Sequence, residues 1–176
     1  MSKNFLVGIL LMAIIISCQP QDPNIDQSGQ DELLSHELNH TIDTSLIEYE
    51  DIFYVPIYSD IYVNTQNQNS LLAATLSVRN TSYNDSLFIS KIDYFNTDGD
   101  LVRNFIQKTI GLPPMASINY VIEKEDTSGG AGANFIVSLS AKKRSVKPVI
   151  QAVMIGENGN NQGFSFLTEG YSIKDQ

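Results

Sequence analysis

The chain has 176 residues, a formal net charge of −9, 42% hydrophobic residues and no tryptophan. An acidic surface of this kind repels polyanions, which argues against nucleic acid as a partner. The apolar fraction is ordinary for a soluble domain, and the length suits one domain with a continuous core rather than several.

The beginning of the chain has the layout of an export signal. Lys3 is followed by an apolar run from Phe5 to Ile16, which is shorter than the roughly 20 residues that a membrane-spanning helix needs. We therefore expect residues 1–17 to be a signal peptide and the protein to be exported.

Cys18 is the only cysteine in the chain and directly follows this signal. The preceding Ile15-Ile16-Ser17 resembles the lipobox of bacterial lipoproteins, and this resemblance implies that Cys18 carries acyl chains such as palmitate. Several acyl chains anchor a protein firmly, because each buried methylene contributes roughly 0.8 kcal/mol. We expect a lipoprotein of the cell envelope, and Gln19 after the cysteine favours the outer membrane.

Residues 18–50 are read as a tether between the lipid and a folded domain. The stretch QPQDPNIDQSGQ contains two prolines and almost no apolar residue, which predicts a flexible chain. Residues 31–47 could form one short helix with Asp31 as its N-cap. Its apolar stripe would consist of Leu34, Leu38 and Ile42.

The same segment contains HELNH, with both histidines of the chain, His36 and His40. In a His-Glu-x-x-His helix the two histidines bind zinc and the glutamate, here Glu37, is the general base. No strand precedes the motif and no third ligand follows it at the required spacing. A zinc hydrolase is therefore a remote alternative, and we expect neither a metal nor another cofactor.

From Asp51 onward the sequence predicts strands. The run IFYVPIYSDIYV is rich in β-branched and aromatic residues, and Pro56 indicates an edge or a break within it. Asp98-Gly99 between two strand-like runs predicts a hairpin turn. Strict alternation in LLAATLSVRN puts four apolar residues on one face: Leu72, Ala74, Leu76 and Val78.

In all, about seven to eight short strands recur at spacings of about ten residues. This pattern predicts an all-β fold, a single antiparallel β-sandwich of the Ig-like or fibronectin III-like kind, over residues 51–172. Six blocks also resemble the bacterial domain-of-unknown-function family 3124 (DUF3124): YVPIYSDIY (54–62), LAATLSVRNT (72–81), YFNTDGDLVR (94–103), EKEDTSGGAGANFIV (123–137), VIQAVMIG (149–156) and QGFSF (162–166). The resemblance implies a short exported or lipid-anchored bacterial protein and transfers no catalytic residue.

The glycine-rich stretch 126–134 is the main candidate for binding. It lacks the lysine of a phosphate-binding loop, and a strand rather than a helix follows it. It is therefore either a long turn or a recognition loop for a small ligand or a metal. The candidate residues are Asp126, Ser128, Gly129, Gly130, Gly132 and Asn134.

No set of residues for nucleophilic catalysis is apparent, since both histidines lie outside the strand region and no Gly-x-Ser-x-Gly motif occurs. We therefore expect a non-catalytic envelope lipoprotein that acts as a binding or interaction module. Its partners would be the membrane, through the lipid, and an envelope protein or glycan.

Overall fold

The computed structural model describes residues 36–39, 42–64, 69–157 and 162–174. These residues belong to one compact unit, 32–176. Within them no helix is long and apolar enough to cross a membrane. The elements are η1 (Thr44–Leu46), a short 3-10 helix, and the strands β1 (Tyr49–Pro56), β2 (Asp60–Tyr62), β3 (Asn69–Arg79), β4 (Leu87–Phe95), β5 (Leu101–Asn104), β6 (Ile110–Leu112), β7 (Ser117–Ile122), β8 (Asn134–Ala141), β9 (Val149–Glu157), β10 (Gly163–Glu169) and β11 (Tyr171–Ser172).

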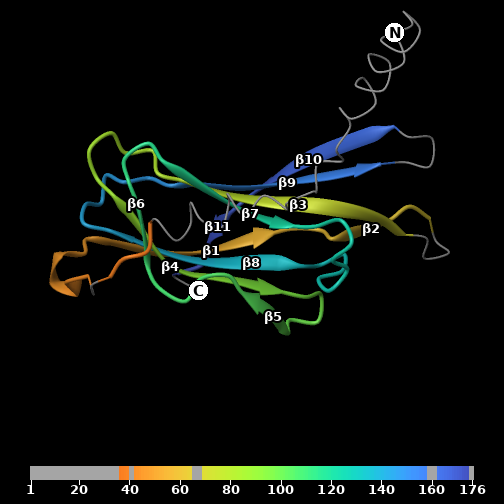
Figure 1. The fold of residues 1–176 in the computed structure, drawn as a ribbon, viewed down its shortest axis with the longest axis horizontal. Helices are drawn as coiled ribbons and strands as arrows, with labels where there is room; N and C mark the ends of the chain where they lie inside the picture. The colour runs from red at the N-terminus through yellow and green to blue at the C-terminus, as the bar shows by residue number, and fades with distance from the viewer. Residues whose placement is uncertain (1–35, 40–41, 65–68, 158–161, 175–176) are drawn as a thin grey trace, which may run out of the picture. The chain divides into compact units, whose positions relative to one another are not determined.

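The strands form two antiparallel sheets (Figure 1). Sheet A has the order β11-β1-β8-β4-β5, and β6 pairs with the same edge of β4 that β5 uses further along. Sheet B has the order β10-β9-β3-β2, and β7 likewise pairs with β3. The predicted all-β fold of two antiparallel sheets is thus confirmed, whereas its Ig-like or fibronectin III-like detail stays a prediction.

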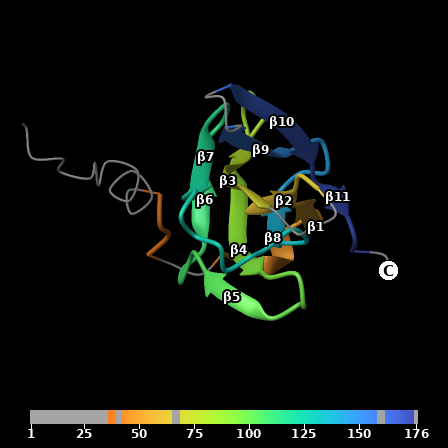
Figure 2. The same ribbon diagram turned by 90° about the vertical axis from the view of Figure 1, so that its right-hand side faces the viewer.

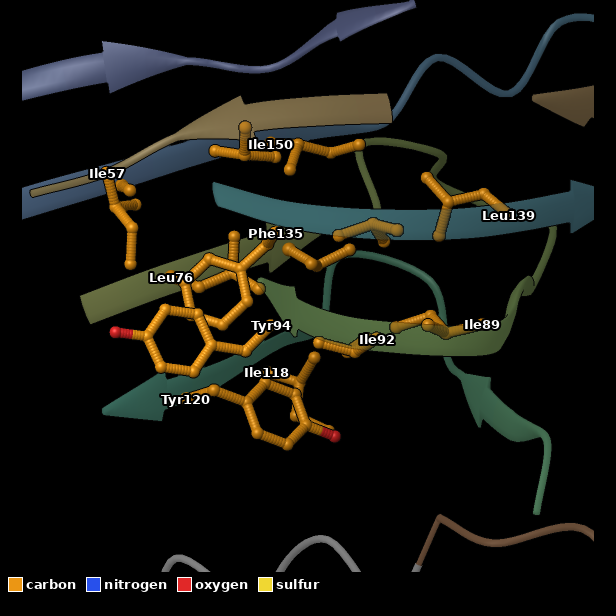
Figure 3. Close-up of a cluster of buried hydrophobic side chains, with 14 of the residues drawn as sticks. Ile57, Leu76, Ile89, Ile92, Tyr94, Ile118, Tyr120, Phe135, Leu139 and Ile150 are labelled. Carbon is orange, nitrogen blue, oxygen red and sulfur yellow. The ribbon is translucent and has the colours of Figure 1, made fainter. Parts of the chain in front are cut away.

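A single hydrophobic core lies between the sheets, and Figure 2 shows the two layers after a 90° turn. The alternation predicted for β3 is confirmed, because Leu72, Ala74, Leu76 and Val78 are all fully buried. From sheet A, Tyr94 and Phe135 pack with their ring centroids 5.4 Å apart. Figure 3 shows these two rings beside Leu76 of sheet B, so that residues of both sheets share the core.

Two predicted breaks are confirmed. The chain turns between β4 and β5 at Gly99, whose φ of +85° is one that L side chains rarely adopt, and this is the hairpin expected from Asp98-Gly99. β1 ends at Pro56, and the chain then crosses from sheet A to β2 in sheet B. The described residues contain eleven strands rather than seven or eight, because the run IFYVPIYSDIYV divides into β1 and β2, the stretch 101–112 divides into β5 and β6, and β11 has only two residues.

The helix predicted over residues 31–47 is wrong for the part of that segment that is described. Glu37 forms an antiparallel β-bridge with Ile110, and the amide of Leu38 donates to the Thr109 carbonyl at 2.9 Å. Further along, only the single turn η1 is helical, capped by the Asp43 carboxylate, which accepts from the Ser45 amide at 3.0 Å. The segment around Glu37 therefore forms its backbone hydrogen bonds with the free edge of β6 and not within a helix.

Candidate functional site

A pocket of about 800 Å³ lies on the outer face of sheet A. On β8, Val137 and Leu139 face the core, so the intervening Ser138 and Ser140 face outward. We call this site the serine pocket. Its lining consists of Leu38, Asn39, Ile42, Thr44, Ile47, Glu50, Asp51, Ile52, Ser90, Gln107, Lys108, Thr109, Ser138, Leu139, Ser140 and Lys174.

The floor of the serine pocket carries three hydroxyl groups. Ser138 lies opposite Ile52 of β1 and Ser140 lies opposite Glu50, so these four side chains share one face. Ser90 comes from the neighbouring strand β4, at a β-bulge, and its hydroxyl donates to the Ser138 carbonyl at 3.4 Å. Among the described residues, the hydroxyls of Ser138 and Ser140 have no hydrogen-bond partner. The floor can therefore both donate and accept hydrogen bonds.

Aliphatic side chains contribute to the walls of the pocket, among polar ones. The segment before β1 supplies Leu38, Ile42 and Ile47, and β1 itself supplies Ile52, which is 36% exposed. Leu38 is held in place over β6, because a Cβ atom on Gly111 would lie 2.9 Å from the Leu38 Cδ2 atom. A ligand would thus meet apolar surface beside a polar floor.

The charged groups around the pocket are already paired. Lys108 Nζ lies 3.1 Å from Glu37 Oε2, and Lys174 Nζ lies 3.5 Å from Glu50 Oε2 and 3.0 Å from the Glu50 carbonyl oxygen. The Asp51 carboxylate accepts from the Ser172 hydroxyl at 2.6 Å. Because each of the two lysines is paired with a glutamate, the pocket offers no unpaired cation to select an anion.

The glycine-rich stretch is packed against the turn between β4 and β5. The Thr97 hydroxyl donates to the Gly129 carbonyl at 3.0 Å and accepts from the Gly132 amide at 2.9 Å. Gly130 has a φ of +73°, and its carbonyl accepts from the Ser59 amide at 3.1 Å. A Cβ atom on Gly129 would lie 1.9 Å from the hydroxyl oxygen of a tyrosine, Tyr94. Close packing therefore accounts for these glycines.

Asp126 and Ser128, two of the polar candidates in this stretch, also have partners inside the protein. The Asp126 carboxylate accepts from both the amide and the hydroxyl of Ser128 and forms an ion pair with Arg103 at 3.0 Å. These hydrogen bonds, with Arg103 beside them, hold the pKa of Asp126 below its usual range. Asn134 begins β8 and is paired on both sides. Ligand binding by this loop stays a prediction.

The remaining candidates are not gathered into a site. His36 lies in a turn directly before the β-bridge of Glu37, and the Glu37 carboxylate forms an ion pair with Lys108. Cys18 and His40 lie outside the described residues, as do the predicted signal and the tether up to Gln30. Nowhere in the described ranges do three His, Cys, Asp or Glu side chains come together as metal ligands.

Sequence reasoning missed the serine pocket. Its lining comes from parts of the chain between Leu38 and Lys174, and its serines alternate with core residues as any solvated strand face does. The only sequence signal was the density of serine in SLFIS and VSLSA, where outward positions carry small hydroxyl side chains.

These observations define an all-β protein of two antiparallel sheets with a pocket on one outer face that combines a serine floor with aliphatic and polar walls. A family model described as "Protein of unknown function (DUF3124)" matches residues 50–173, and the chain belongs to this family. No curated protein matches it. The solved structure of Thermotoga maritima 1070 is similar, with 16% identity and a TM-score of 0.40 over 69% of this chain and 92% of that one.

Proposed function

We propose that this protein is a non-catalytic, lipid-anchored lipoprotein of the bacterial envelope whose β-sheet domain binds a ligand in the serine pocket. The pocket is the observation that carries the binding role, since it is large enough for a small molecule and is lined from several elements. The anchor is supported by the sequence before Gln19: a basic residue, an apolar run and a lipobox-like end at Cys18.

The chemistry of the pocket favours a neutral ligand with one hydroxylated face and one apolar face. Ser90, Ser138 and Ser140 offer hydrogen bonds from the floor, while Ile42 and Ile52 offer aliphatic surface. A charged ligand would have to displace the Lys108–Glu37 or Lys174–Glu50 ion pair. Glycosides and glycolipid fragments of the envelope have this combination of faces.

Binding can be tested with a neutral glycoside of this shape. Octyl glucoside, kept below its micelle concentration, is titrated into the isotope-labelled full chain while amide chemical shifts are followed. We expect saturable shifts at Ser138 and Ser140. Ser140→Phe, which places a ring over the serine floor, should abolish them, whereas the matched Thr75→Phe on the outer face of sheet B should not. Shifts that do not saturate, or that persist in Ser140→Phe, would contradict binding at this site.

The anchor is tested separately by mass spectrometry of the chain extracted from membranes of a bacterial host. We expect the mass of a chain that begins at Cys18 and carries acyl groups. Cys18→Ala should abolish both the added mass and the membrane association, whereas Ser17→Ala, which keeps a small residue at that position, should retain both. An unmodified Cys18 in the membrane fraction would exclude the lipid anchor without affecting the binding result.

A further inference from the structure

Strand β10 is the longest strand that ends a sheet in the described part of the chain. It has seven residues and lies at the end of sheet B, where it pairs only with β9 (Figure 2). The other strands that pair on one side only have two to six residues: β2, β5, β6, β7 and β11. Of these, β6 is partly covered by the bridge to Glu37.

The backbone of β10 offers a row of hydrogen-bonding groups on its free edge. The Gly170 amide donates to the Ile150 carbonyl at 2.9 Å, and hydrogen-bonded pairs alternate along an antiparallel ladder. Phe164, Phe166 and Thr168 therefore bond to β9. The amide and carbonyl groups of Ser165, Leu167 and Glu169 point away from β9, and no described residue bonds to them.

The side chains of β10 do not protect this edge. Natural edge strands avoid pairing by means of lysine, proline, bulges or short length. In β10 the register with β9 is regular over all seven residues, and the only charged residue is Glu169 at its end. Leu167 is 50% exposed on the outer face, and the neighbouring Ile155 of β9 is 54% exposed.

We propose that β10 pairs antiparallel with β10 of a second copy of this chain, which joins two copies of sheet B into one continuous sheet. A twofold axis at Phe166 overlaps all seven residues of both strands. It places Ser165 opposite Leu167 of the second copy, so that the outward-pointing backbone groups bond to one another. Glu169 then lies opposite Gly163, and the two glutamates stay apart. In a chain of net charge −9, two copies can meet on this edge without opposing like charges.

The first test removes one outward-pointing amide without touching the ladder to β9. Proline at an edge position keeps the strand but cannot donate to a further strand. We expect the full chain in mild detergent to show a dimer mass by light scattering, and Ser165→Pro to be monomeric. The matched control is Asn119→Pro on β7, at the opposite edge of sheet B. The Asn80 amide donates to the Ala116 carbonyl, so by alternation the Asn119 amide also faces outward. This control should stay dimeric.

A second test does not depend on how well a proline variant folds. Ser165→Cys and Leu167→Cys chains are mixed and oxidised, with the wild-type chain, which has only Cys18, as the background. In the proposed register the mixture should form a disulfide-linked dimer in greater yield than either variant alone. A monomeric wild-type chain, a dimer that survives in folded Ser165→Pro, or no extra linkage in the mixture would each overturn the proposal. The first of these results would leave β10 free for a strand of another protein.

Discussion

At the scale of single residues, the core contains a polar atom without a partner. Tyr120 is 4% exposed, and its ring packs edge-on against Phe105 with the centroids 5.2 Å apart. Its hydroxyl makes no hydrogen bond with any described residue. Burial, with the charge of Glu37 as a smaller contribution, raises the pKa of Tyr120, so the hydroxyl stays protonated at neutral pH. A buried donor without an acceptor costs free energy that the fold must offset elsewhere.

We predict that Tyr120→Phe stabilises the protein. The ring contact with Phe105 is kept while the orphan hydroxyl is removed, which should raise the free energy of unfolding by about 1 kcal/mol. Urea unfolding measures the change. Tyr49→Phe is the matched control. The Tyr49 hydroxyl donates to Asp51 Oδ2 at 3.3 Å, so its removal should lower the free energy of unfolding. Loss of stability in Tyr120→Phe would show that its hydroxyl has a partner.

Asp126 gives the fold a dependence on pH. Its pKa is lowered from 3.8, first by the Ser128 hydroxyl and then by the Ser128 amide and Arg103, against the opposing effect of burial. A carboxylate whose pKa is lower in the folded state stabilises the fold above its unfolded pKa. This contribution is lost as the pH falls through the lower, folded value.

Asp126→Asn should therefore reduce stability by about 1 kcal/mol at pH 7, because a charge-assisted hydrogen bond and a partly exposed ion pair are lost. The difference from wild type should vanish as the pH falls below the lowered pKa of Asp126. Thermal unfolding of both proteins from about pH 2 to about pH 7, a range that spans ordinary carboxylate pKa values, measures this difference. The control is Asp98→Asn, since the exposed Asp98 carboxylate accepts no hydrogen bond among the described residues. A constant difference at all pH values would contradict this account.

At the scale of elements, the sequence predicted correctly those features that depend only on residues close together in the chain. Alternation in β3 and the turn at Gly99 depend on local residues and a buried face, and both were predictable. The helix over 31–47 failed because Leu38 has the same spacing in a helical stripe, yet its real neighbour, Gly111, lies more than seventy residues away. The serine pocket was not predictable for the same reason.

The docking of the N-terminal segment on β6 can be measured by hydrogen exchange. The Leu38 amide donates to the Thr109 carbonyl, and the Gly111 amide donates to the His36 carbonyl, both at 2.9 Å. Leu38→Ala removes apolar contact with Gly111 and should speed exchange at both amides by about tenfold. Leu46→Ala is the control, because Leu46 is 52% exposed. Unchanged exchange in Leu38→Ala would show that this side chain does not hold the segment.

At the scale of the whole molecule, the two sheets are joined by the chain as well as by the core. After β1 the chain leaves sheet A and enters β2 of sheet B, and after β10 it returns at Gly170 to β11 of sheet A. The Thr168 hydroxyl donates to the Pro56 carbonyl at 2.6 Å, next to both crossings. Because each sheet buries its inner face only against the other, neither has a core of its own.

We therefore predict a single cooperative unfolding transition that is shared by both sheets. Leu76 of β3 and Ile92 of β4 are fully buried on opposite sides of the core. Leu76→Ala and Ile92→Ala should each lower the free energy of unfolding by about 2–5 kcal/mol, and each should shift the whole transition. Calorimetry measures this, with the calorimetric and van't Hoff enthalpies expected to agree. A variant in which one sheet unfolds at a lower temperature while the other keeps its wild-type midpoint would show two separate cores, in conflict with the shared packing of Leu76, Tyr94 and Phe135.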